Sequence, residues 1–201
     1  AENYLKFFDS IMEIQKADIS SLKGFGELDA NNQPQYATFH EFITDTFADD
    51  RDDYWKNWRE LFDTSMMTKE FFETYYEKML HYSKYCENQR YFTNNALFFG
   101  NMVIMENSVG FLDWSRVAVT DWLLDFACID LHRPYFLIPE KLVTYFQKKG
   151  IVVENFKERF LCMAYYKGLD ALRWHASIQD DASCKTIMES ILALEQRILN
   201  L

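Results

Sequence analysis

Apolar residues recur every three or four positions through most of the chain, which is the spacing of helices that bury one face. Leu5, Phe8, Ile11 and Met12 form the first such face, and a polar, turn-rich stretch interrupts the pattern at residues 28–34. The pattern predicts further helices at about 39–47, within a long block at 55–85, at 122–131, at 140–149 and at 153–175, followed by a final helix with Ile187, Ile191, Leu194 and Ile198 on one face.

The helical spacing gives way to short extended segments in the middle of the chain. Residues 90–93 read as a short strand. Two apolar segments, 102–105 and 109–112, are separated by the polar triplet 106–108, which is the pattern of a hairpin with a three-residue loop. The chain shows no internal repeat, low-complexity tract or flexible linker. We therefore predict a mainly α (α+β) fold with one small hairpin, organised as a single unit over residues 1–201.

The composition is that of a globular protein with a sizeable core. Of the 201 residues, 49% are apolar and 17% are aromatic, which argues against disorder. The sequence contains no stretch as long as a membrane-spanning helix and no recognisable signal peptide. We therefore expect no membrane partner.

Cysteines and histidines show no metal-binding pattern. The cysteines lie far apart without a CxxC pair, which argues against a disulfide framework or a zinc site and favours a reducing cytoplasm; they are Cys86, Cys128, Cys162 and Cys184. The histidines have no ligand spacing either, and we expect them at surface or capping positions; they are His40, His81, His132 and His175.

The charge balance bears on the choice of partner. A formal net charge of −10 makes nucleic acid a poor partner, because phosphate backbones are bound by Lys and Arg. The same charge would attract a polycationic small molecule. Acidic runs at residues 48–53 and 180–181 contribute most locally, and each is also explained as a solvated loop or as charge at a helix N-terminus.

The predicted hairpin carries the clearest candidate chemistry. Asn101 precedes it and Asp113 follows it, so a tight turn can bring an amide oxygen and a carboxylate to one end of the ribbon. Two oxygen ligands in that arrangement suit a metal–phosphate site. Such a site also needs a carboxylate base, yet no Asp or Glu lies between Glu87 and Glu106. Taken alone, Asp113 is also explained as a helix cap beside a buried Trp114.

The motifs around the hairpin resemble those of the aminoglycoside phosphotransferase family, which has a protein-kinase-like fold. The matching segments read Gly-Asn-Met-Val-Ile at 100–104, Phe-Leu-Asp-Trp-Ser at 111–115 and Leu-Asp-Phe-Ala at 124–127. Within the family they are most similar to the hygromycin phosphotransferase branch. The order of elements matches over nearly the whole chain, while the specific motifs lie within 94–127. The resemblance implies the C-terminal, helical lobe of such a kinase.

The resemblance implies roles for particular residues. Asn101 resembles the catalytic-loop Asn that holds a magnesium ion, and Asp113 resembles the Asp that bridges the metal to the nucleotide phosphates. Both are hard oxygen ligands, which magnesium prefers. Asp121 and Asp125 lie where the family braces its catalytic loop, and a bracing role is expected for them here.

The resemblance also shows what the catalytic loop lacks. The family's base Asp corresponds to Ala96 in this chain, and the His before it corresponds to Asn94. An alanine methyl accepts no proton, and the amide of Asn94 does not titrate near neutrality. Loss of a general base typically lowers a rate by a factor of about 10²–10⁴.

By the same resemblance, Mg²⁺ and a nucleotide, ATP or GTP, are the expected cofactors. The family covers the nucleotide with an N-terminal lobe that carries a phosphate-binding loop and a strand lysine. This chain begins in what resembles the first helix after that lobe, and none of its six glycines forms a phosphate-cradling loop. We therefore expect a C-terminal lobe without its nucleotide lobe, and the missing parts argue against full use of these cofactors by the chain alone.

Three interpretations of function follow. The first is an aminoglycoside phosphotransferase-like protein whose transfer of phosphate to a hydroxyl is impaired. The second is a non-catalytic binding or regulatory module for a cationic, aminoglycoside-like ligand or for a partner protein, which would be the missing lobe or a second copy of the chain. The third is a fragment of a complete enzyme, and the absence of a base at Ala96 would then still need an explanation.

Overall fold

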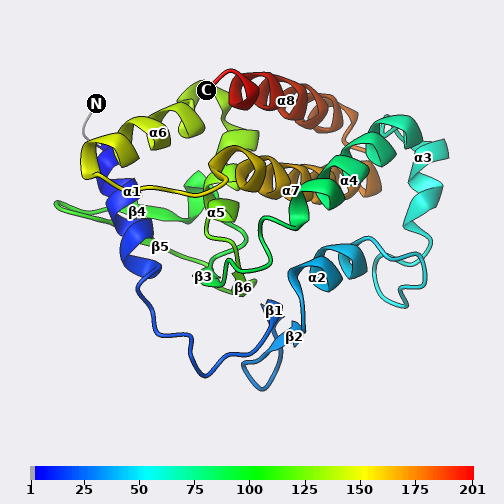
Figure 1. The fold of residues 1–201 in the computed structure, drawn as a ribbon. Coiled ribbons are helices and arrows are strands. Elements are labelled where there is room, and N and C mark those ends of the chain that lie inside the picture. The colour runs from blue at the N-terminus through cyan, green and yellow to red at the C-terminus, as the bar shows by residue number, and fades with distance from the viewer. Residues whose placement is uncertain (1–2) are drawn as a thin grey trace.

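The computed structural model describes residues 3–201, which form a mainly helical molecule with two small antiparallel sheets (Figure 1). The helices are α1 (Asn3–Ile14), α2 (Phe39–Thr46), α3 (Leu61–Thr64), α4 (Lys69–Ser83), α5 (Leu123–His132), α6 (Ile138–Lys149), α7 (Phe156–Ser177) and α8 (Asp181–Leu199). The strands are β1 (Phe25–Leu28), β2 (Pro34–Tyr36), β3 (Tyr91–Thr93), β4 (Met102–Ile104), β5 (Val109–Phe111) and β6 (Ala118–Thr120), and the short 3₁₀ turns are η1 (Trp58–Glu60), η2 (Phe99–Asn101) and η3 (Pro134–Phe136). The predicted mainly α fold class is confirmed.

Helix α7 forms the centre of the helical core. It packs against α4, α5 and α8, and Figure 1 shows it running beside α4 and below α8. Gly168 allows α8 to approach closely, because a Cβ at this position would lie 2.6 Å from Cδ1 of Ile191. Since real Cβ atoms do not come that close to another carbon, the packing of α7 on α8 requires glycine here.

Most of the predicted helices are present with recognisable ends. Helix α2 begins with a capping box, in which the Thr38 hydroxyl accepts from the Glu41 N–H at 3.1 Å and the Glu41 carboxylate accepts from the Thr38 N–H at 3.1 Å. Helix α6 has Pro139 in its first turn and ends at Gly150, whose φ of 65° is the left-handed value typical of helix C-termini.

The long helical block predicted at residues 55–85 is divided in the structure. It consists of η1, α3 and α4, with breaks at Asn57, which has a φ of 58°, and at Ser65, which is extended. Thr68 then caps α4 by accepting from the Phe71 N–H at 3.3 Å. Short polar residues that bond to nearby backbone groups therefore interrupt an apolar pattern that is helical on both sides.

A four-stranded sheet was not predicted from the sequence. Its order is β2-β1-β6-β3, and all of its pairings are antiparallel. Its strands have only three or four residues, too few for a period-two pattern to stand out. Gly24, just before β1, lies against the backbone of β2, where a Cβ would be 2.1 Å from the Tyr36 carbonyl oxygen. The sheet places β3, which leads into the candidate loop, beside β6 and, through it, β1.

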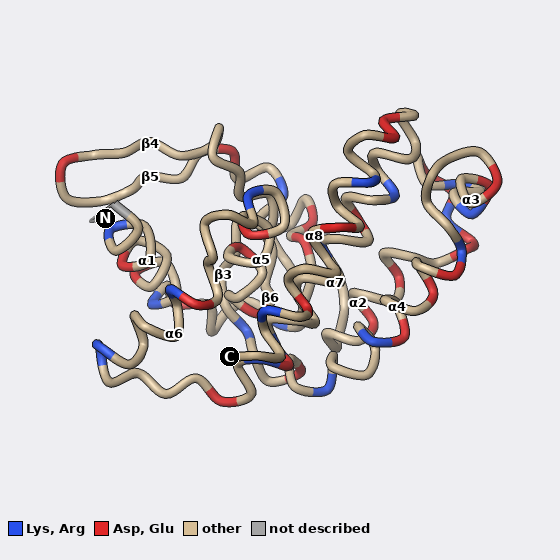
Figure 2. The backbone as a smooth tube through the Cα atoms, turned by 90° about the horizontal axis from the view of Figure 1, so that it is seen from above, with Lys and Arg blue, Asp and Glu red and all other residues tan. Residues whose placement is uncertain are grey.

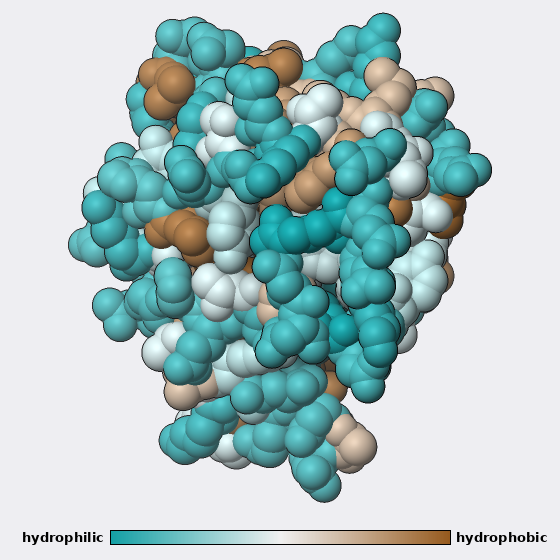
Figure 3. Space-filling view, turned by 90° about the vertical axis from the view of Figure 1, so that its right-hand side faces the viewer, coloured by the Kyte–Doolittle hydropathy of each residue, from teal (hydrophilic) through white to brown (hydrophobic). Residues whose placement is uncertain are grey.

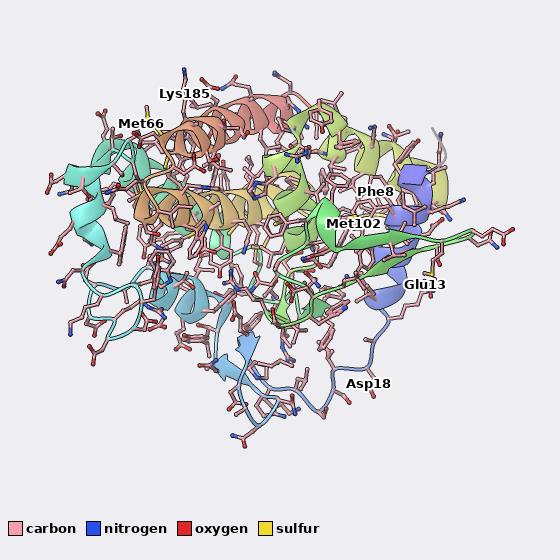
Figure 4. The ribbon with its side chains drawn as sticks, turned by 180° about the vertical axis from the view of Figure 1, so that it is seen from behind. Phe8, Glu13, Asp18, Met66, Met102 and Lys185 are labelled. Atoms are coloured by element: carbon pink, nitrogen blue, oxygen red, sulfur yellow. The ribbon has the colours of Figure 1, made fainter. Side chains whose placement is uncertain are left out.

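The predicted hairpin is confirmed as β4 and β5. Met102 pairs with Phe111 and Ile104 with Val109, and the two strands project from the body as a ribbon (Figures 1 and 2). Helix α1 supports the ribbon, because the Val109 N–H donates to the Ser10 hydroxyl at 2.9 Å. Figure 4 shows Met102 where the ribbon joins the body, with α1 alongside.

The interior is rich in aromatic contacts, and the described cysteines lie within it. All four cysteines are buried and none forms a disulfide, as the sequence predicts.

Among residues 3–201, no helix combines the length and apolarity needed to cross a membrane. The face that carries α3 is mostly hydrophilic, with apolar side chains in small separate spots (Figure 3).

Candidate functional site

The loop that follows β3, residues 94–101, is held at its start by a buried carboxylate. Asp125, in the first turn of α5, accepts hydrogen bonds from the backbone N–H groups of Asn94 and Asn95, each at 2.9 Å. Burial raises the pKa of Asp125 to about 6, although these two hydrogen bonds and the charge of Lys167 oppose the rise. The contact fixes the backbone immediately before Ala96.

Asn95 ties the same loop to α7 and to β1. It has a left-handed φ of 60°, which turns its carbonyl toward α7, where Lys167 Nζ donates to it at 3.0 Å. Its side-chain amide donates to Glu27 Oε1 at 3.0 Å. Asn95 is therefore held by three elements that are distant in sequence, namely α5 through Asp125, α7 through Lys167 and β1 through Glu27.

The loop is also joined to the end of the hairpin. The side-chain amide of Asn94 donates to the carbonyl oxygens of Leu112 and Asp113 at 3.2 and 3.0 Å, and its oxygen accepts from the Ala96 N–H at 3.2 Å. Asn101 Nδ2 donates to the Ala96 carbonyl at 3.3 Å. Asn94 thus has a structural role that its amide can fulfil without titrating.

Asn101 and Asp113 lie at the same end of the β4–β5 ribbon. The Leu112 N–H donates to the Asn101 carbonyl at 2.8 Å, so the two backbone segments are adjacent. Because Asn101 Nδ2 is directed at Ala96, its Oδ1 is the atom left to face a cation. The structure therefore brings these two predicted ligands together in the backbone, while their roles stay predictions.

Asp113 is an exposed carboxylate at the end of the ribbon. Its φ is 53°, and its Oδ1 accepts from the Ser115 hydroxyl at 2.6 Å and from the Ser115 N–H at 3.3 Å. These hydrogen bonds lower the pKa of Asp113, and the side chain is ionised at neutral pH, as an exposed carboxylate ordinarily is. Across residues 3–201, no three His, Cys, Asp or Glu side chains gather as a metal site would require. A metal here would therefore depend on Asn101, Asp113 and oxygens of a ligand.

Two carboxylates approach the loop from distant parts of the chain, which the sequence did not reveal. Glu27 comes from β1, and its Oε1 accepts from Arg116 Nε and Nη2 at 2.9 and 2.7 Å as well as from Asn95. Asp170 comes from α7 and lies 3.6 Å from Lys167 Nζ. Glu27 contacts Asn95, the residue before Ala96, whereas Asp170 contacts Lys167, Arg116 and Arg173; both acids are held in ion pairs, and no described contact directs either of them at Ala96.

The charged neighbours determine the state of Asp170. Burial alone would raise its pKa, but the positive charges of Lys167, Arg116 and Arg173 outweigh burial and lower it. An ionised carboxylate that already binds three cations is a weak proton acceptor. Asp170 is therefore a poor candidate for a general base beside Ala96.

Asp121, the second predicted bracing residue, occupies a different place. Its carboxylate pairs with Arg159 through two hydrogen bonds of 2.7 and 2.9 Å, and its Oδ1 accepts from the Leu123 N–H at 3.0 Å. Both charged groups are buried. Asp121 therefore links the start of α5 to α7, whereas Asp125 is the residue that contacts the loop; the bracing role of each stays a prediction.

The histidines are not all isolated in space. His132 at the end of α5 and His175 on α7 line the same cavity, together with Lys167 and Asp170. A second cavity lies on the other side of Arg116 and Asp170, which contribute to both. Sequence spacing gave no signal for this grouping, because the residues belong to elements that only the helical packing brings together.

Comparison with solved structures shows the same fold in aminoglycoside phosphotransferase APH(4)-Ia. One structure of that protein matches 97% of this chain with a TM-score of 0.75 and 18% identity. A thermostable mutant in ternary complex with ADP and hygromycin B matches with a TM-score of 0.76 and 20% identity, and an apo form matches with 0.72 and 19%. This chain spans 64% of the length of each of them.

Sequence comparison alone detects no such relationship. No protein-family model matches the chain, and no curated protein matches it significantly. The likeness therefore rests on the arrangement of elements and on the few motif residues around the hairpin. The chain has the fold of an aminoglycoside phosphotransferase over 97% of its length, as the resemblance of those motifs predicted.

Proposed function

We propose that this chain is the substrate lobe of a small-molecule kinase of the aminoglycoside phosphotransferase type, with an impaired phosphoryl-transfer site. The observation that carries the proposal is a loop fixed in place by Asp125 and Lys167 that presents the methyl of Ala96 where a base is needed. The surrounding hydrogen bonds preserve the loop, while the proton acceptor is missing. Phosphoryl transfer would then need a covering lobe, from the same polypeptide or from another.

The residues at the ribbon end fit a magnesium ion. Asn101 Oδ1 and the ionised carboxylate of Asp113 are hard oxygen ligands, and magnesium commonly takes one or two protein oxygens together with phosphate oxygens and water. When bound, the ion would neutralise charge on a nucleotide phosphate. Asn101 and Asp113 would hold it, and Ser115 would keep the Asp113 carboxylate oriented through its hydroxyl.

The experiment replaces magnesium by paramagnetic Mn²⁺ and records amide NMR spectra with ADP present. We expect broadening centred on residues 101 and 112–115, and its loss in Asp113→Asn. Asp50→Asn is the matched control, because it removes the same charge from an exposed acidic run. Broadening that is unchanged by Asp113→Asn would contradict the metal assignment. Turnover of a hydroxylated substrate at an ordinary kinase rate with Ala96 in place would contradict the proposed impairment.

A second candidate function is binding of a cationic small molecule without chemistry. The net charge of −10 favours it, and solved structures of similar fold contain hygromycin B. Calorimetry with hygromycin B at low and high salt tests this candidate, because an electrostatic attraction weakens as ions screen it. Absence of binding at low salt would remove the candidate.

A partner protein remains part of this second candidate. It would be a nucleotide lobe on another polypeptide or a second copy of the chain. Sedimentation velocity over a range of concentrations tests the second copy. A sedimentation coefficient independent of concentration would exclude self-association in that range.

A further inference from the structure

A cavity of about 540 Å³ lies between α5, α7 and α8, next to the candidate loop. Part of its wall is apolar, formed by Phe98 of the loop, Leu131 of α5, Trp174 of α7 and Ile187 of α8. A space of this size holds a small organic molecule. The apolar wall would contact a ring or a short aliphatic body.

The rest of the lining is strongly basic. Arg116, Arg133 and Lys167 face the cavity, and Asp170 is the one carboxylate in the described lining. Asp170 is shared, because it lies 3.6 Å from Lys167, 3.7 Å from Arg116 and 3.1 Å from Arg173. Arg116 also pairs with Glu27 at 2.7 Å, so Asp170 and Glu27 together face three cations, and two carboxylates leave one positive charge unmatched.

Arg133 adds a cation without a counter-charge. It is exposed at the end of α5, and within residues 3–201 it forms no ion pair; its Nη1 donates to the His132 carbonyl at 2.8 Å. The excess positive charge is therefore located at the mouth as well as in the wall. An anion would find two guanidinium groups and an ammonium group within one lining.

His132 reports the same imbalance. Burial, together with the positive charges of His175, Lys167 and Arg133, lowers its pKa to about 4. Phe98, whose ring centroid is 4.9 Å from that of His132, supplies an apolar neighbour. No acid appears among the groups that act on His132, although Asp170 lines the same space.

We propose that this cavity binds a small organic anion, with a carboxylate or phosphate group at Lys167, Arg116 and Arg133 and an apolar body against Trp174 and Ile187. This inference goes beyond the proposed function and does not depend on metal binding. It is opposite in sign to the cationic ligand suggested by the net charge of the whole chain, because the local charge at this cavity is positive.

The test uses phenyl phosphate as the probe, with phenol as its neutral counterpart and inorganic phosphate as the anion without a ring. Binding is measured by calorimetry in EDTA, so that failure of the metal site has no influence on the result. We expect phenyl phosphate to bind more tightly than either counterpart, because each lacks one half of the recognition. Equal binding of phenol would overturn the ionic part, and equal binding of inorganic phosphate would overturn the apolar part.

Arg133→Gln is the informative variant, since its exposed side chain can be changed without opening the core. We expect it to weaken phenyl phosphate binding about fivefold, as for one exposed charge pair. The control, Lys185→Gln, removes the same charge from α8, where Figure 4 shows Lys185 on the outer side, and should leave binding unchanged. Equal effects of the two variants would show only a general charge effect and would contradict the proposal.

The imidazole resonances of His132 give an independent readout on the wild-type protein. A bound anion favours the imidazolium form, so the pKa of His132 should rise when phenyl phosphate saturates the cavity. No change in that pKa would place the ligand elsewhere and overturn the site. A response of His132 to hygromycin B in place of phenyl phosphate would also overturn it, because the cavity would then accept a cation.

Discussion

Asp125 shows how a single buried side chain can fix the backbone at the start of the candidate loop. Each of its two carboxylate oxygens accepts a hydrogen bond from one backbone N–H, that of Asn94 or that of Asn95, and the side chain is buried. Because the partners are backbone groups, the contact is independent of the side chain at position 96. The geometry of the loop therefore does not depend on whether residue 96 carries a proton acceptor.

Asp125 makes a testable contribution to the pH dependence of stability. Its pKa is 3.8 in the reference state and about 6 in the folded protein. The contribution of this group to folding is therefore complete below about pH 3.8 and is lost as the pH rises through 6, a change of about 3 kcal/mol by linkage.

Asp125→Asn removes that titration and places an N–H donor against a backbone N–H. We expect a destabilisation of about 1–3 kcal/mol from the unsatisfied group. The loss measured by urea unfolding should be larger at pH 4.5 than at pH 7, because the wild-type protein alone gains stability at low pH from this group. Asp50→Asn serves as the exposed control. A loss that grows as the pH rises would contradict the sign of the shift.

Position 96 carries a second prediction at the residue scale. Ala96→Asp restores a carboxylate on a loop whose backbone is already fixed, yet residues 1–201 contribute no phosphate-cradling glycine loop. We expect no phosphorylation of an aminoglycoside by this variant when labelled ATP and Mg²⁺ are supplied. Product formed by Ala96→Asp above the wild-type background would show that the covering lobe is dispensable.

At the scale of elements, the sequence predicts what is long or strongly patterned. The helices α5 to α8 and the β4–β5 hairpin follow from apolar spacing and from turn residues such as Gly150. Of the four-stranded sheet only β3 follows, as the strand predicted at residues 90–93; β1, β2 and β6 have three or four residues and no hairpin pattern with their partners to mark them. The gap matters for the site, since β1 is the element that brings Glu27 to the loop.

The α7–α8 contact provides a prediction that runs against helix propensity. In an isolated helix, Gly168→Ala would stabilise by about 1 kcal/mol. Here the added Cβ would lie 2.6 Å from Ile191 Cδ1, so we expect a net destabilisation of about 1–3 kcal/mol from overpacking. Thermal unfolding measures the change.

A second substitution identifies the cause. Ile191→Ala removes both atoms that the new methyl would strike, Cδ1 at 2.6 Å and Cγ1 at 2.8 Å, so the double variant should recover part of the loss relative to the sum of the two single changes. Strict additivity of the two substitutions would show that the clash is not the source of the destabilisation.

At the scale of the whole molecule, the candidate site is assembled from segments far apart in sequence. Lys167 on α7, Asp125 on α5 and Glu27 on β1 all reach residues 94–95. The hairpin motif predicts Asn101 and Asp113 because these residues lie close in sequence, one before and one after the same hairpin. Partners that are distant in sequence give no such local signal. The basic cavity could not be predicted either, because the net charge of −10 describes the whole chain and not the charge at one cavity.

The buried cysteines allow a prediction about the whole molecule. All four are at most 1% exposed, and burial raises the pKa of Cys128 to about 11. Disulfide reagents react with thiolates, so burial protects all four groups in the folded state, and the raised pKa protects Cys128 further. We expect slow labelling by a coloured disulfide reagent in buffer and rapid labelling of four thiols in denaturant. Fast labelling of any thiol in native buffer would show that its segment opens locally.

The rate at which each buried thiol is labelled consequently measures how often its part of the molecule opens. Cys86 lies just after α4, Cys128 in α5, Cys162 in α7 and Cys184 in α8, so the four groups sample most of the helical core. Mass spectrometry of partly labelled protein would rank these segments by how often each becomes accessible. Because no engineered probe is required, the same measurement could be repeated with each ligand considered above, and the segment that becomes slower to react would locate where that ligand acts.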